Sequence, residues 1–144
     1  MKLEHQVCTL EQSKRLKELG IEQFKGLFRW CCFCPDPTGE SYFYEPVFGD
    51  GLDTGITGEF IADAFTVAEL GVMLPQSPTD NINYSWYHRN CWKGHSVGYA
   101  FHGIEPIERG WFETEAEARA DLLIHLLESG LTTAADCNAR LIGK

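Results

Sequence analysis

Positive charge is scarce in this sequence. Lysine and arginine number 12 against 21 aspartate and glutamate residues, so the formal net charge at pH 7 is −9. Duplex DNA and anionic membranes are bound by proteins that present a basic surface. The charge balance therefore argues against general binding to duplex nucleic acid or to a membrane. The acidic residues occur singly and in pairs, which favours a role in solubility over mimicry of a nucleic acid.

Long hydrophobic runs are also missing. The longest apolar stretch, residues 122–127, is interrupted by His125, whereas a membrane-spanning helix needs about 20 apolar residues. The first 15 residues contain no apolar run, so the sequence predicts no signal peptide. The six cysteines are too few for 144 residues to indicate a disulfide scaffold. We therefore expect reduced thiols and a cytoplasmic protein.

Catalytic signatures are few. The triplet Asp53-Thr54-Gly55 occurs at aspartic-protease active sites, but those enzymes are built almost wholly of strands, and here it lies in a glycine-rich stretch, residues 48–58. If the stretch were a calcium loop that began at Asp50, its twelfth position would be Ile61, where a glutamate is required. It also lacks the Lys-Ser/Thr ending of a phosphate-binding loop. We predict a plain loop there.

Cys91 could form a nucleophile and base with His88 or His95. Such a pair must lie within hydrogen-bonding reach. No acyl-enzyme signature surrounds Cys91, no helix N-terminus near it would lower its pKa, and no G-x-S-x-G motif occurs in the chain. The sequence therefore assigns no catalytic residue.

The strongest structural signal is a helix over residues 114–131. Thr114 and Glu117 have the spacing of a capping box, and Gly130 stands where a helix ends in a left-handed residue. Apolar side chains at three- and four-residue spacings predict one broad buried face. That face consists of Ala116, Ala120, Leu123, Ile124 and Leu127.

The remaining patterns predict an α+β fold. Capping residues mark helices at 9–20 and 65–74 and a short helix beginning near residue 133. Aromatic and alternating segments predict strands at 27–34, 41–47, 84–88 and 97–102, with a turn at 104–109. The order is α-β-β-α-β-β-α-α. We expect one domain, residues 1–144, in which two β-hairpins form an antiparallel sheet packed by three to four helices.

The loop of the second hairpin holds the most distinctive chemistry. The segment HRNCWKGH, residues 88–95, concentrates cations and histidines around a tryptophan in an otherwise acidic chain. Arginine supplies planar donors, lysine a point charge and tryptophan a stacking surface. This combination suits an anionic or nucleotide-like ligand or a contact with a protein partner; the alternative is a solvated hairpin tip. The candidate binding residues are His88, Arg89, Trp92, Lys93 and His95.

Zinc is an alternative cofactor; our primary expectation is that the protein has none. A C-x-x-C at Cys31 and Cys34 and an H-x-x-C at His88 and Cys91 could together supply four ligands. The two halves are far apart in the chain, however. Moreover, if residues 27–34 form a strand, Cys31 and Cys34 point to opposite faces of it. Small thiols packed in an aromatic core are the competing interpretation.

Several helical segments are familiar in combination. They are MKLE (1–4), QVC (6–8), SKRLKELG (13–20), FTVAELG (65–71), EAEARA (115–120) and GL (130–131). In these segments the chain resembles a group of small uncharacterised proteins carried by bacterial prophages and other mobile elements. The resemblance implies an accessory role in a phage or mobile element and no particular chemistry.

Two functions of different classes follow. The first is a non-enzymatic accessory protein that binds a host or phage protein, or a small anionic or nucleotide-like ligand, in order to counter a host defence. The second is a small metal-binding protein or thiol enzyme that uses the cysteines and histidines. The aromatic content of 12% is sufficient for both a core and an interface, so homo-oligomerisation is also open.

Overall fold

A computed structural model describes residues 2–33, 42–48, 58–79 and 84–143. The triplet at 53–55, most of the predicted loop at 48–58 and Cys34 lie outside these ranges. In chain order the elements are the 3-10 helix η1 (Leu3–His5), α1 (Leu10–Glu18), β1 (Phe28–Phe33), β2 (Phe43–Phe48), β3 (Gly58–Ala64), α2 (Val67–Met73), β4 (Ser85–Cys91), β5 (Gly94–Phe101), β6 (Ile104–Glu108), α3 (Glu115–Glu128) and α4 (Ala134–Ile142).

The predicted α+β class and the order of the predicted elements are confirmed. Each predicted hairpin is extended by a third strand. The described strands form two separate antiparallel sheets, ordered β2-β1-β3 and β4-β5-β6, where one sheet was expected. The segment 104–109, predicted as a turn, is mostly strand β6. It pairs with β5 because Gly103, with φ +82°, reverses the chain between Phe101 and Ile104.

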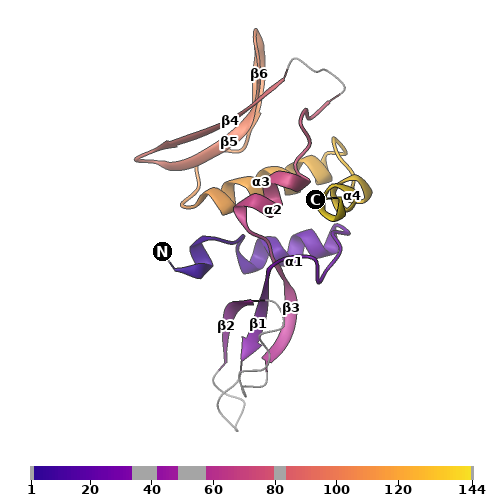
Figure 1. Cartoon of the computed structure of the whole chain (residues 1–144). Helices are drawn as coiled ribbons and strands as arrows, with labels where there is room; N and C mark the ends of the chain where they lie inside the picture. The colour runs from indigo at the N-terminus through magenta and orange to yellow at the C-terminus, as the bar shows by residue number, and fades with distance from the viewer. Residues whose placement is uncertain (1, 34–41, 49–57, 80–83, 144) are drawn as a thin grey trace.

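The two sheets lie on opposite sides of the helices (Figure 1). The sheet β4-β5-β6 lies over α2 and α3, α4 lies beside them near the C-terminus, and α1 separates them from the sheet β1-β2-β3. The main core joins residues from both ends of the chain, from Cys8 to Cys137. A smaller core of Val7, Trp30 and Ala64 lies beneath the first sheet.

Helix α3 forms much as its sequence predicts, but it is buried more widely. The Thr114 hydroxyl accepts a hydrogen bond from the Glu117 N–H, and Gly130 adopts φ +76° just beyond the helix. Leu122 and Leu126, outside the predicted face, are fully buried. Ile124 and Leu127, inside that face, are only partly buried. The reason is that β5 packs on one side of α3 while α1 and α2 pack on others.

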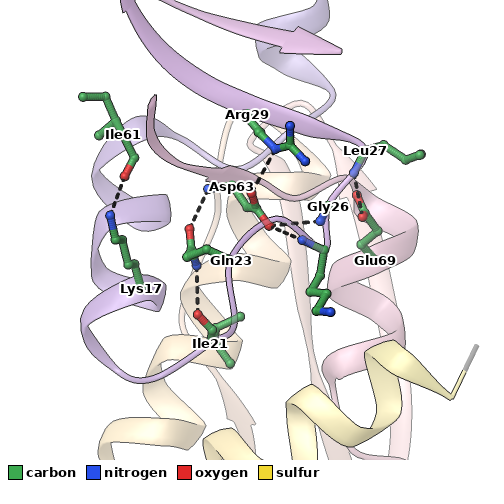
Figure 2. Close-up of polar contacts among 10 residues, drawn as sticks. Lys17, Ile21, Gln23, Gly26, Leu27, Arg29, Ile61, Asp63 and Glu69 are labelled. Carbon is green, nitrogen blue, oxygen red and sulfur yellow. Dashed lines mark hydrogen bonds and ion pairs between the residues drawn. The ribbon is translucent and has the colours of Figure 1, made fainter. Parts of the chain in front are cut away.

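A buried carboxylate ties the irregular segment after α1 to β3 (Figure 2). The Asp63 side chain has no exposed surface, and one of its oxygens accepts the amide N–H groups of Lys25 and Gly26 at 2.8 and 3.0 Å. Its other oxygen lies 3.8 Å from the Arg29 guanidinium. Glu69, in the first turn of α2, accepts the Leu27 amide N–H at 3.0 Å. Two carboxylates therefore satisfy backbone donors that no strand or helix pairs.

The described cysteines are all free thiols, and most of them are buried. Burial raises the pKa of the Cys8 thiol to about 11, and the Cys137 thiol is shifted in the same direction for the same reason. These groups act as small apolar side chains in the core.

No helix within the described ranges is long and apolar enough to cross a membrane.

The depth of burial along α3 predicts unequal costs of truncation. Leu123→Ala should lower the free energy of unfolding by about 2–5 kcal/mol, because the removed atoms leave a cavity in a closed core. Leu127→Ala should cost less, because this side chain is only partly buried. Urea unfolding followed by circular dichroism measures both. Equal losses would contradict the packing described for α3.

Candidate functional site

The tip of the β4–β5 hairpin is shorter than the sequence suggested. The segment 89–94 was expected to be a loop, but strand pairing continues to Cys91 opposite Gly94. Only Trp92 and Lys93 remain in the turn. Gly94 has φ +111°, a conformation that glycine adopts at little cost.

Strand pairing places the five predicted binding residues on two faces of the hairpin and at its apex. His88 pairs with Val97 and Asn90 pairs with His95, so alternation places both histidines on the face that carries Val97 toward the helices. Arg89 lies one residue out of phase, on the opposite, outer face. Trp92 and Lys93 lie at the apex, so the predicted set is not a single cluster.

On the outer face, Arg89 and its neighbours form an ion-paired aromatic group. Its guanidinium donates to Glu108 at 2.6 Å and lies 5.0 and 5.5 Å from the ring centres of Tyr87 and Trp111. The Tyr87 hydroxyl also donates to Glu108. Burial, together with this hydrogen bond, raises the pKa of Tyr87 to about 12. The Arg89 charge is thus already balanced by a carboxylate of the same chain.

The apex itself is open to solvent. Trp92 is 89% exposed, the largest exposure among the large hydrophobic residues of the described ranges. The Lys93 ammonium lies 5.5 Å from the Trp92 ring centre and 5.8 Å from that of Trp111. Cation–π contacts of this kind hold a charge beside an aromatic surface. The turn therefore presents an indole and a cation together.

On the helix-facing side, the two histidines meet Glu115 from the first turn of α3; we call these three residues the His–Glu cluster. The imidazoles of His88 and His95 are stacked, with ring centres 5.3 Å apart, and share a hydrogen bond of 3.0 Å between Nε2 and Nδ1. His88 Nδ1 lies 3.5 Å from Glu115 Oε1. One potential ligand atom from each of the three lies within 4.8 Å of the others.

Backbone contacts hold this cluster in place. His95 and Phe112 exchange two backbone hydrogen bonds, of 2.7 and 2.8 Å, which tie the start of β5 to the segment that leads into α3. At Gly94 an added Cβ would lie 2.2 Å from the Phe112 carbonyl oxygen. The absence of a side chain at residue 94 is therefore what lets the hairpin approach the segment before α3 so closely.

A hollow of about 520 Å³ borders the His–Glu cluster. Its lining comes from η1, the start of α2, β5 and the start of α3. The residues are His5, Gln6, Thr66, Val67, Ala68, His95, Glu113, Thr114 and Glu115.

Of the predicted zinc ligands Cys31, Cys34, His88 and Cys91, the structure does not bring Cys31 near His88 and Cys91. Cys31 is buried on β1, whereas His88 and Cys91 belong to β4 in the sheet beyond the helices (Figure 1). Cys34 lies outside the described residues. Alternation along β4 also places the exposed Cys91 on the opposite face from both histidines. This arrangement gives no support to a thiol–imidazole pair.

Sequence reasoning missed the residues that complete both groups. Neither Glu115 nor Trp111 was among the candidate binding residues. Glu108 was assigned to a turn. Glu108 reaches the hairpin through the pairing of β5 with β6, and Trp111 and Glu115 reach it through the pairing of His95 with Phe112.

The close approach at Gly94 predicts that a side chain at this position destabilises the fold more than a side chain at Gly103 does. Gly103→Ala should destabilise the fold by about 1–2 kcal/mol through left-handed backbone strain alone, because open space surrounds the added methyl group. Gly94→Ala should cost roughly 1–3 kcal/mol more, since it also forces apart the two hydrogen bonds between His95 and Phe112. Urea unfolding of both variants measures the difference. Equal losses would contradict a tight contact at Gly94.

Comparison of the chain with known protein families, with curated proteins and with solved structures finds no match in any of the three.

Proposed function

We propose that this protein is a non-enzymatic, cytoplasmic accessory protein of a phage or mobile element, which binds a protein partner through the tip of the β4–β5 hairpin. The observation that carries the proposal is the exposure of Trp92, at 89%, on a two-residue turn beside Lys93. Exposure of a large aromatic side chain to water is unfavourable in free energy, and burial against a partner removes this unfavourable term. Tryptophan is among the residues most enriched at the centres of protein interfaces.

The shape of the tip favours a protein over a small ligand. Small molecules bind in concave sites that enclose most of their surface, whereas Trp92 and Lys93 project from the end of a hairpin. The charge distribution supports the same choice. Arg89 is paired with Glu108 at 2.6 Å, so one of the two cations expected to hold a small anion is already neutralised.

The chemistry of the partner follows from the tip. An apolar pocket would take the Trp92 indole, and a carboxylate at its rim would meet Lys93, for which no carboxylate partner is described within residues 84–143. The resemblance of the helical segments to prophage proteins supplies the biological setting. A host protein, in particular one that takes part in defence against phages, is the partner we propose.

Photo-crosslinking at the apex tests this proposal. A photoreactive phenylalanine analogue at position 92 should give a defined adduct in a lysate of the host bacterium. The same analogue at position 142 is the matched control, because Ile142 is also exposed, at 60%, but lies on α4. The same adducts from both positions would refute binding through the hairpin tip.

Competition then identifies the side chains responsible. Excess unlabelled wild-type protein should abolish the adduct at position 92, whereas the double variant Trp92→Ala, Lys93→Ala should not. Trp92 supports little of the fold, so the double variant should unfold within about 0.5 kcal/mol of the wild type. Equal competition by the double variant would show that the apex does not contribute to binding.

A further inference from the structure

Three side chains that zinc commonly uses as ligands converge on the helix-facing side of the hairpin. His88 comes from β4, His95 from β5 and Glu115 from the first turn of α3. Two imidazoles and a carboxylate form a frequent protein ligand set for zinc, in sites that keep a further coordination position open. The cluster joins a hairpin to a helix, so an ion there would add a further link to the contacts that already connect the two elements.

The spacing of the ligand atoms suits a small ion. Zinc bonds to nitrogen and oxygen measure about 2.0–2.2 Å, which places tetrahedral ligand atoms about 3.3–3.5 Å apart. His88 faces the other two side chains with different ring nitrogens: its Nε2 lies 3.0 Å from His95 Nδ1, and its Nδ1 lies 3.5 Å from Glu115 Oε1. One ligand atom from each of the three residues lies within 4.8 Å of the other two. Binding of one ion requires the imidazoles to turn so that a single nitrogen of His88 faces the same point as His95 and Glu115.

The surrounding residues hold the ligands as a metal site requires. Arg119 donates to Glu115 Oε2 through Nε at 2.7 Å and approaches it through its terminal nitrogen at 2.6 Å, which leaves Oε1 directed toward His88. The Arg119 guanidinium is itself held 5.2 Å from the Trp86 ring centre. His95 is fixed by its backbone pair with Phe112. Groups that orient the ligands in this way contribute strongly to metal affinity.

One side of the cluster faces open space. His95 and Glu115 both line the hollow of about 520 Å³ beside the helices. An ion held by three protein atoms would therefore have room on that side for water or for an exchangeable anion. The side chains of His88 and Glu115 remain 29% and 23% exposed, so an ion can reach the cluster from solvent.

We infer that this protein binds one zinc ion through His88, His95 and Glu115, with a remaining coordination position directed into the hollow. The mixed nitrogen and oxygen set favours zinc over magnesium and calcium, which prefer oxygen ligands alone. This site shares only His88 with the cysteine-based set considered from the sequence. It is also independent of partner binding at Trp92, which lies at the apex.

Titration calorimetry with zinc chloride tests the inference. The full chain, without a histidine tag, is stripped with a chelator and kept reduced with a phosphine. Wild-type protein should bind one equivalent of zinc. His95→Ala and Glu115→Gln should each weaken zinc binding at least tenfold, whereas the control variants Cys91→Ser and His102→Ala should stay within about twofold of the wild type, because neither residue belongs to the cluster. Absence of zinc binding by the wild type, or its loss in Cys91→Ser with retention in His95→Ala, would overturn the assignment.

Cobalt substitution gives a second test that needs no variant. Cobalt bound by two imidazoles and a carboxylate should show visible d–d absorption without a thiolate-to-cobalt charge-transfer band. A charge-transfer band would show that cysteines bind the metal and would refute the site. Circular dichroism of the metal-free variants shows whether each variant is folded. A native spectrum together with weakened zinc binding supports the site. If the variants are unfolded, the cobalt spectrum of the wild type tests the site instead.

Discussion

The burial of α3 from several sides is the constraint on which the rest of the structure depends. Its leucines and alanines contact β5 on one side and α1 and α2 on others, so the helix has no wholly solvated face along its middle. Hydrophobic burial of this extent is the main favourable term in folding. Because the N-terminal turn of the same helix carries Glu115, the packing that stabilises the core also sets where that carboxylate meets the hairpin.

Local features of the fold could be predicted from the sequence because their causes are local. Thr9 with Gln12 and Thr66 with Glu69 form complete capping boxes, with both reciprocal hydrogen bonds present. Such boxes need only a three-residue spacing, which is visible in a single sequence. The same holds for Gly130, whose left-handed conformation ends α3. Helix positions and the α+β class followed from signals of this kind.

Features that depend on pairing between distant segments could not be predicted. The third strands β3 and β6 were not predicted, and their pairing depends on where β1 and β5 already lie. The prediction of the candidate site was the least accurate for this reason. Five residues close together in sequence were taken as one group, but the strand register sends Arg89 to one face and the two histidines to the other.

The strand order has a consequence for association between copies of the chain. Among the described residues, each three-stranded sheet ends in two edge strands, and such edges can recruit strands from other molecules. One edge strand of each sheet contains a proline: Pro46 in β2 pairs with Trp30, and Pro106 in β6 lies where the register with β5 shifts. Proline lacks an amide hydrogen and is tolerated in an edge strand where that donor would face outward. Unwanted growth of either sheet is therefore obstructed at β2 and β6, which leaves β3 and β4 as the edges where a strand from another molecule could add.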